Sequence, residues 1–502
     1  MDHRINKETA VCTKRVLDTE ITQAVEHDFI LPDYCPDIFR VLKCFVVPGV
    51  VSTSINGSRL SFELSVTMRV MYRSGSGGIA CIEHTCEYTK SADLPADADG
   101  PAVIVTPYVQ NVNCRASDKR RVDVRAGVVC RVCVDAEDKR SLVIGARGGG
   151  IQLKKEQALF PTARIVAAKR ITVIEELELA AGKPAFGSVL RCGTAVALGE
   201  SRIMSGKLVT KGEAEISLVY LPKGVDEPPE SMRFSIPFSQ ILDVDGLTDD
   251  LDTDVTVNAA RCVITPREEN GLLECELILT VNITAMRCTE GELVTDAYST
   301  RCECELDRMA EPITLPPEKL RVGSTAEAVL SSPEGEISRV YDLWTDGAAA
   351  SVISADEGSE VSGRVTFCML AVLADGTPCY IEKECTFKAD TQAAAGSRVT
   401  VSSQSSSYTL SENGSVKCKT DLELSVSRAP SEEARYITDI RLLTDSPKMN
   451  DSGCAVKICF SDSNESVWDI AKRYSTEPQA IEEQNPAAEG SARRALIIPI
   501  KN

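Results

Sequence analysis

Alternation of apolar and polar residues is the main pattern along this chain. From Arg59 to Tyr72 every second residue is apolar, and the residues between them are charged or hydroxylated. Successive side chains of a β-strand point to opposite faces, so the pattern predicts a strand with one buried and one solvated face, as in antiparallel sheets. The apolar positions are Leu60, Phe62, Leu64, Val66, Met68, Val70 and Tyr72.

The same pattern returns twice further along the chain. It recurs at residues 208–220 and, more weakly, at 361–373, and each copy runs into a turn that contains glycine. After each turn come a strand that ends in an aromatic residue, a β-branched run and a closing strand. Because the order and spacing agree, we predict a mainly β protein with three tandem antiparallel domains that resemble β-sandwiches.

A short apolar segment that begins with proline precedes each copy. In the first copy Pro36 is followed by Ile38, Val41 and Leu42, and similar segments begin at Pro184 and Pro333. Proline is favoured at the first position of a helix, and the spacing of the apolar residues is helical. We therefore expect one or two helical turns packed on each sheet.

Breaks in the pattern give the expected domain boundaries. A glycine-rich joint at 145–150 separates a first domain, 1–150, from a second, 151–290. The third and most divergent copy occupies 291–430, and a polar linker is expected at 431–453. A different module follows at 454–502.

Composition narrows the functional class. The 502 residues are 43 % hydrophobic, enough for several cores, and the net charge is 55 − 74 = −19, which argues against nucleic acid. The first residues lack the apolar core of a signal peptide, and no run approaches the roughly 20 apolar residues of a membrane span. We expect a cytosolic protein whose twenty cysteines are reduced and serve as small apolar residues.

Catalytic residues are not expected. The chain has three histidines, and His84 lies in a strand pattern where a solvated side chain is the simplest interpretation. Asp33 and Asp37 flank Cys35 in one turn and could in principle form an acid–base pair, but aspartate and proline also build turns.

Metal and cofactor sites are not expected either. Cys130 and Cys133 lie three apart on a predicted strand, so they point to opposite faces and cannot share one ion. Cys302 and Cys304 share a face but have no second pair nearby. The sequence thus predicts no metal and no cofactor.

The C-terminal residues predict the order strand, helix, helix, strand. Residues 455–460 alternate like a strand, Ser466 can cap a helix that runs to Tyr474, and a second helix spans Pro478 to Gln484. The closing strand is residues 495–500. This βααβ module resembles a LysM domain: residues 464–471 fit its first motif, Asn485-Pro486 its second and Ile498-Pro499 its third.

The start of the chain carries a second resemblance. Residues 27–38 resemble the opening of the SPOCS domain, and three such units followed by one LysM module are similar to the SipL-like family of spore-coat morphogenetic proteins. The resemblance implies a non-enzymatic adaptor in spore coat assembly. It also implies that the protein is made in the mother-cell cytoplasm and later lies in the coat at the forespore surface. The implied partner of the LysM module is the SpoIVA-type ATPase of the basement layer, and other coat proteins are further partners.

The resemblance also points to site residues. Trp468 either fills the module's core or anchors a partner, because large aromatic residues are common at interfaces. A partner would contact the apolar residues Val456, Ile458, Trp468 and Ile470 or depend on them for the shape of the surface. Lys472 and Arg473 would add a basic rim.

A second functional hypothesis is glycan binding. LysM domains generally bind N-acetylglucosamine polymers, so the alternative is a protein that reads peptidoglycan or cortex glycan. The residues that would face the sugar are Asn464, Glu465, Ser466, Asn485 and Pro486.

Overall fold

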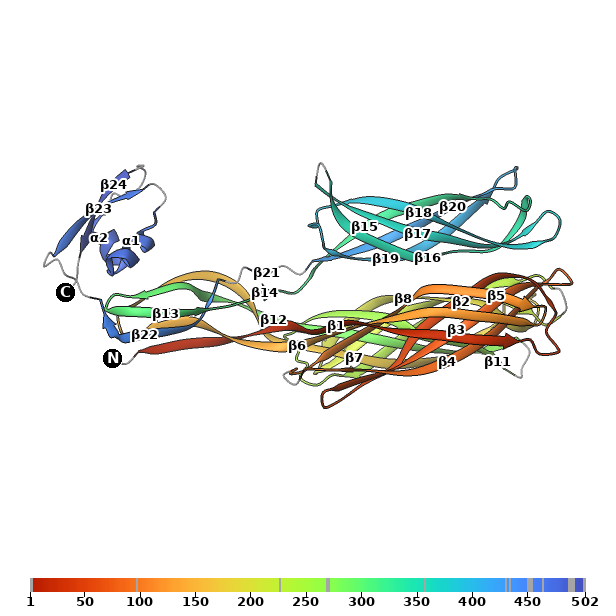
Figure 1. The fold of residues 1–502 in the computed structure, drawn as a ribbon, viewed down its shortest axis with the longest axis horizontal. Helices are drawn as coiled ribbons and strands as arrows, with labels where there is room; N and C mark the ends of the chain where they lie inside the picture. Colours follow the sequence, from red (N-terminus) through yellow and green to blue (C-terminus); the bar gives the residue numbers. More distant parts are fainter. Residues whose placement is uncertain are drawn as a thin grey trace.

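The chain is almost entirely antiparallel β-structure, as predicted (Figure 1). The computed structural model describes residues 3–95, 98–224, 227–267, 271–355, 358–428, 431–432, 435–448, 455–462, 465–485 and 493–499. None of the helices in these ranges is both long and apolar enough to cross a membrane.

A unit of six strands occurs three times. Unit 1 contains β1 (Arg4–Ile30), β2 (Ile38–Asn56), β3 (Arg59–Ser74), β4 (Ile79–Asp93), β5 (Ala102–Asp118) and β6 (Arg121–Arg147). Unit 2 contains β7 (Ile151–Glu178), β8 (Phe186–Met204), β9 (Lys207–Pro222), β10 (Glu230–Asp243), β11 (Asp252–Pro266) and β12 (Leu272–Ser299). Unit 3 contains β15 (Glu318–Leu330), β16 (Ile337–Ala355), β17 (Gly358–Leu373), β18 (Pro378–Thr391), β19 (Arg398–Leu410) and β20 (Val416–Arg428).

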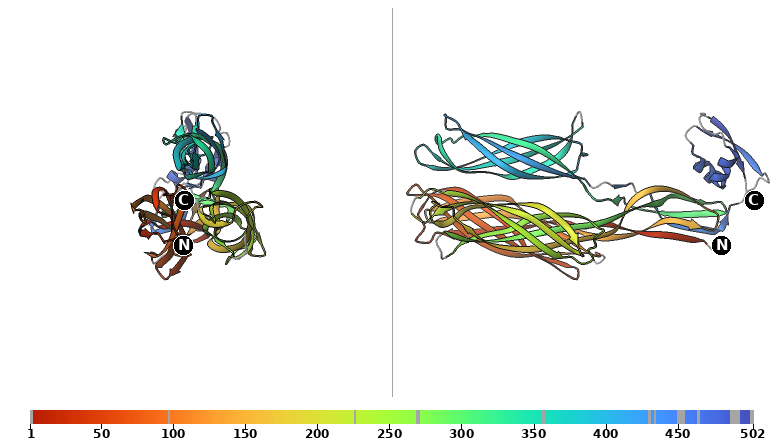
Figure 2. Two further views of the ribbon diagram at one scale, coloured as in Figure 1. Left: turned by 90° about the vertical axis from the view of Figure 1, so that its right-hand side faces the viewer. Right: turned by 180° about the vertical axis from the view of Figure 1, so that it is seen from behind.

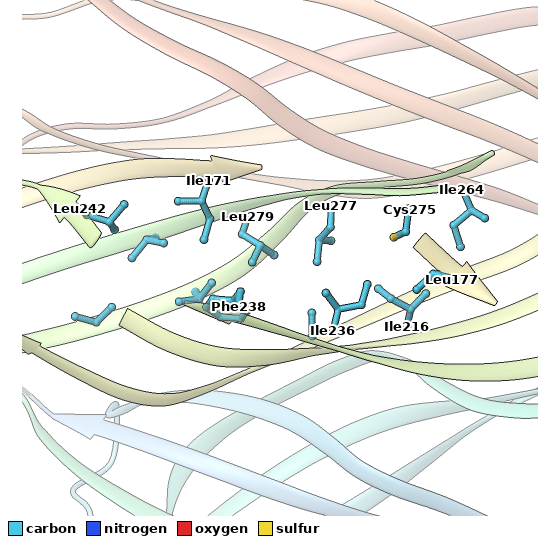
Figure 3. Close-up of a cluster of buried hydrophobic side chains, with 14 of the residues drawn as sticks. Ile171, Leu177, Ile216, Ile236, Phe238, Leu242, Ile264, Cys275, Leu277 and Leu279 are labelled. Carbon is cyan, nitrogen blue, oxygen red and sulfur yellow. The ribbon is translucent and has the colours of Figure 1, made fainter. Parts of the chain in front are cut away.

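Each unit is a sandwich of two three-stranded sheets. In unit 1 the sheet orders are β1-β6-β5 and β2-β3-β4, and units 2 and 3 repeat this topology with β7-β12-β11, β8-β9-β10, β15-β20-β19 and β16-β17-β18. The alternating residues of the third strand, such as Leu60 and Phe62, are buried between the sheets. Figure 3 shows the corresponding core of unit 2, where side chains from both sheets interdigitate.

The predicted helical turns are strands, and this prediction was wrong. Residues 38–42 begin β2, whose pairing with β3 contains bulges between Ile38 and Arg40 and between Val41 and Lys43. Each bulge inserts one extra residue, so the inward side chains recur at every third position and imitate a helical period. The bulges recur at the equivalent places in β8 and β16.

Two of the prolines before these strands accept hydrogen bonds from buried tyrosines. The hydroxyl of Tyr72 donates a hydrogen bond of 3.1 Å to the carbonyl oxygen of Pro36, and Tyr220 repeats the bond to Pro184 at 2.9 Å. Both tyrosine rings are fully buried. The proline segment is therefore fixed as the extended start of a strand.

A stalk extends from the sandwiches of units 1 and 2. It consists of the parts of β1, β6, β7 and β12 that continue past the sandwich cores, together with β13 (Cys302–Arg308), β14 (Ile313–Thr314), β21 (Ser431–Glu432) and β22 (Ile437–Pro447). β13 pairs with β22 and β14 with β21. Figure 1 shows the stalk as a narrow continuation of the long strands, with the N-terminus at its end.

The stalk core takes one residue from an equivalent position of each repeat. Val143, Val294 and Ile437 form one such set, and Leu142, Leu293 and Tyr436 form the next; all are fully buried. β13, β14 and β15 thus correspond to a β1 that is broken into three pieces, and β20, β21 and β22 correspond to a broken β6. The break lies where the β1–β6 ladder has its bulge between Arg15 and Leu17.

Two expected domain boundaries differ from these strands. The boundary at 290/291 falls inside β12, which continues to Ser299, and the expected linker at 431–453 contains β22. Adjacent residues such as Leu293 and Val294 are both buried in these segments and belong to different clusters, so the strict alternation of the sandwich strands is lost.

The three sandwiches pack side by side. The end-on view in Figure 2 shows them at the corners of a triangle. Met71, Val219 and Leu370 occupy equivalent positions on β3, β9 and β17 and are buried where the units meet, next to Trp344. The molecule is therefore a rod with three sandwiches at one end and the stalk at the other.

Candidate functional site

The C-terminal module contains every site residue predicted from the sequence. Its elements are β23 (Val456–Asp462), α1 (Val467–Tyr474), α2 (Pro478–Gln484) and β24 (Arg493–Pro499), with β23 and β24 paired antiparallel. The helix α1 begins after Ser466, whose hydroxyl accepts a bond of 3.2 Å from the backbone N–H of Asp469. Proline at the first position of α2 suits a helix start, because its missing N–H has no partner there.

The helix α1 is bound to the stalk through one carboxylate. The indole Nε1 of Trp468 donates 2.8 Å to Oδ2 of Asp296 in β12, and Lys472 Nζ lies 2.8 and 2.7 Å from the two oxygens of the same carboxylate. Trp468 and Lys472 are four residues apart and share one helix face. Arg308 of β13 adds an ion pair of 3.1 Å to Asp296. Charge-assisted bonds of this kind are stronger than neutral ones.

The environment of Asp296 favours its charged form. Burial raises the pKa of this carboxyl, but the hydrogen bonds from Lys472 and Trp468 outweigh burial, and the resulting pKa lies below the ordinary value. The docking contact is therefore made by an ionised carboxylate.

Tyr298, also on β12, completes the hydrophobic core of the module. Its ring packs edge-on against Trp468 with 5.0 Å between centroids, and it lies among Ile470, Ala471 and other buried residues. The hydroxyl donates a buried hydrogen bond of 2.6 Å to the carbonyl oxygen of Thr476. Burial raises the pKa of Tyr298, so the phenol keeps its proton. The module and the stalk thus share one core.

These contacts place several predicted site residues inside the chain's own packing. Ile470 is fully buried, and Trp468 and Lys472 bind Asp296. Arg473 forms an ion pair with Glu465. The sequence could not show this, because the partner carboxylate lies 172 residues away from Trp468.

The outer face of the module is apolar and exposed. Val456, Ile458 and Phe460 alternate along β23 with exposures of 50 %, 67 % and 76 %, and Ile497, opposite Ile458, is 41 % exposed. We call these four residues the outer apolar row. Cys459 points to the inner side and is buried against the helices. Contiguous exposed apolar side chains mark interaction surfaces on soluble proteins.

Phe460 was missed as a site residue, although the sequence carried the signal. It lies two residues after Ile458, so strand alternation places it on the same face as Val456 and Ile458. The structure brings these predicted residues together with Phe460 and Ile497, and it separates them from Trp468, Ile470 and Lys472. In Figure 1 the helix α1 lies on the stalk side of the module, so the row faces away from the stalk.

Three of the predicted glycan-facing residues, Glu465, Ser466 and Asn485, make contacts within the module. Asn464 and Pro486 lie outside the described residues. The side-chain amide of Asn485 donates to the carbonyl oxygens of Ile481 and Ile497 and accepts from the backbone N–H of Ile497, at 2.7 to 2.9 Å. Glu465 pairs with Arg473, and Ser466 caps α1. The described polar groups of this loop therefore make internal contacts.

A hollow of about 580 Å³ lies at the opposite end of the rod. It is lined by the turn 74–78, by the turn 375–378 and by Glu227, together with Phe39 and Tyr341. The described residues of its lining include no histidine or cysteine, and Asp375 accepts a hydrogen bond of 2.8 Å from the backbone N–H of Thr377. The hollow offers polar backbone and aromatic contacts.

The comparison with known families gives one match. Residues 187–265 match the SipL, SPOCS domain, and no curated protein and no solved structure matches the chain. The matched segment runs from the start of β8 to the end of β11 and leaves out the two long strands of unit 2. This similarity points to a sporulation-related coat protein.

Proposed function

We propose that this chain is a non-enzymatic structural adaptor in spore coat assembly. In this proposal the outer apolar row binds the SpoIVA-type ATPase of the coat's basement layer, and the three sandwiches present assembly surfaces to other coat proteins. The observation that carries the proposal is the row itself: large apolar side chains left exposed on a module that is otherwise packed and hydrogen-bonded. The similarity of unit 2 to the SPOCS domain supports a role in sporulation.

The anchorage of the module supports an adaptor. Trp468, Lys472 and Tyr298 hold α1 on the stalk, so a partner that binds the outer apolar row is also held in a fixed orientation to the rod. Rigid presentation lowers the entropy that is lost when a complex forms. An enzyme would need convergent catalytic groups in a pocket, whereas an adaptor needs only surfaces that are spaced and held apart.

Binding of the full-length chain to the purified basement-layer ATPase tests the proposal. A buried phenylalanine or isoleucine contributes about 2 kcal/mol, so Phe460→Ser and Ile458→Ser should each raise the Kd by roughly 30-fold in surface plasmon resonance. The matched control is Val329→Ser, which removes a similarly exposed apolar side chain from β15, far from the module. Unchanged affinity for both module variants would contradict the proposed surface.

Titration with chitin oligomers distinguishes the glycan hypothesis. The proposal expects no saturable binding to the full-length chain, because the described loop residues are engaged internally. Saturable binding that is lost in Asn485→Ala but kept in Phe460→Ser would favour a glycan-binding protein instead.

A further inference from the structure

Two histidines and a cysteine meet at the open side of the unit 1 sandwich. β1 and β4 are edge strands of the two sheets. His27 pairs across β1–β6 with Val124, whereas His84 and Cys86 of β4 pair with Met68 and Val66. Cross-strand partners point to the same face. Since Val124, Met68 and Val66 are fully buried, all three side chains point into the space between the sheets.

Their ligand atoms lie close together. The imidazole rings of His27 and His84 stack with 3.8 Å between centroids and 8° between planes. One ring nitrogen of each histidine and the Cys86 sulfur lie within 4.8 Å of one another. Phe29 packs edge-on against His27 at 4.5 Å and fixes the inner wall of the cluster.

We propose that His27, His84 and Cys86 form a site for a divalent ion of the zinc class that links β1 to β4. Two imidazoles and one thiolate are a ligand set that Zn²⁺ takes in tetrahedral sites, with the fourth position left to water. Oxygen-preferring ions such as Mg²⁺ and Ca²⁺ do not suit this set. The ion closes the sandwich at an edge where no backbone ladder joins its two sheets.

Only small adjustments are needed for coordination. Tetrahedral geometry with ordinary zinc bond lengths places ligand atoms about 3.3–3.6 Å apart, so distances within the cluster shorten by up to about 1.5 Å. A metal lies in the plane of an imidazole, and therefore the stacked rings must turn relative to each other. His84 is exposed, whereas His27 is half-buried and packs edge-on against Phe29.

Coordination requires particular protonation states of the ligands. A neutral imidazole offers the lone pair that a metal needs, while the thiol releases its proton on binding.

The other two units serve as internal references. The positions of His27, His84 and Cys86 correspond to Glu175, Phe234 and Ile236 in unit 2, and to Ala328, Lys383 and Cys385 in unit 3. Unit 2 places apolar side chains from β10 at this side of its sandwich, where Ile236 is buried. The complete ligand set occurs in unit 1 alone, so the general packing of the unit does not require it.

Cobalt binding to the full-length, reduced and chelator-treated chain tests the site. Tetrahedral Co²⁺ gives intense visible bands, and a bound thiolate adds a charge-transfer band in the near ultraviolet. We expect both bands with one equivalent of Co²⁺ and their loss when Zn²⁺ is added. His84→Phe and Cys86→Ile, which introduce the residues of unit 2, should weaken binding by at least about tenfold. Cys385→Ser should leave binding unchanged.

The variants also exclude unspecific binding. His84→Phe keeps all twenty cysteines, so a thiolate band that forms in this variant with the affinity of the wild type would overturn the proposal. Absence of any band in the wild-type chain would overturn it as well. Zinc-edge absorption spectroscopy should give two nitrogen ligands and one sulfur ligand, and a coordination shell of sulfur alone would assign the ion to other cysteines.

Discussion

Arg191 of β8 and Asp342 of β16 occupy equivalent positions in units 2 and 3, and their side chains meet at 3.2 Å where the units pack together. Both are largely buried. The Arg191 guanidinium also lies over the ring of Trp344, 4.3 Å from its centroid. Lys43 holds the same position in unit 1 and pairs with Glu382 of unit 3 at 2.6 Å. One strand position thus supplies two cations and one anion to the contacts between the sandwiches.

Removal of one partner of this ion pair should weaken the contact of unit 3. Asp342→Ala leaves Arg191 buried without its carboxylate, and we expect a loss of about 3–5 kcal/mol in the free energy of opening this interface. Hydrogen exchange of β16 and β17, and the fluorescence of Trp344 in a Trp468→Phe background, measure the opening.

The double variant is the informative control. Arg191→Met with Asp342→Leu removes both charges and should recover most of the lost stability, because an apolar pair of similar size avoids the cost of burying charge. If the double variant is as unstable as Asp342→Ala, loss of packing rather than the orphaned charge is responsible.

Substitution of Tyr298 should weaken the docking of the module on the stalk. Tyr298→Phe removes the 2.6 Å bond to Thr476 and should cost about 1–2 kcal/mol. Tyr298→Ala also leaves a cavity among Ile470 and Ala471 and should cost about 3–5 kcal/mol. Limited proteolysis between β22 and β23 reports undocking. Equal protease resistance of all three proteins would contradict a shared core.

Acid should release the module through Asp296. The pKa of this carboxyl is lower in the docked state than in the unfolded chain, where it is about 4. Its ionised form therefore stabilises docking at pH values above about 4. This stability is lost as the pH falls through the lower pKa of the docked state. Energy transfer between dyes on α1 and on β22 should therefore change below about pH 4.

Asp296→Asn provides the control for the acid release. The amide cannot ionise, so docking should be weaker at neutral pH, and the acid-dependent change should largely disappear. A release in the variant at the same pH as in the wild type would assign the transition to another group.

Gly212 should not tolerate a side chain. A Cβ at this position in β9 would meet the ring of Phe238 and the carbonyl oxygen of Ala197, so Gly212→Ala should lower the unfolding free energy by about 1–3 kcal/mol. Gly323→Ala in β15 is the matched control, since a Cβ there meets nothing within 4 Å. We expect no loss for Gly323→Ala, and urea unfolding of both variants checks the difference.

The resemblance to the SPOCS domain and the alternation of apolar residues could be recognised in the sequence. The roles of several individual residues and strands could not. The bulges in β2 give Ile38 and Val41 the spacing of a helix, so this strand was predicted as helical. The first strand of each unit, such as β1, was not predicted, because its inward residues change partners between sandwich and stalk. His84 is an exposed strand residue, as expected, but its stacking on His27 was not predicted, since His27 lies on another strand 57 positions earlier.

The mainly β fold, the recurrence of a strand pattern and the βααβ order at the C-terminus could be predicted, because they depend on local periodicity, turn residues and helix caps. The common stalk of the long strands, the exposed face of the module and the contact between Trp468 and Asp296 became visible only in three dimensions. These relationships join residues that are far apart in the chain, and the energy of such contacts depends on burial and geometry that no local pattern encodes.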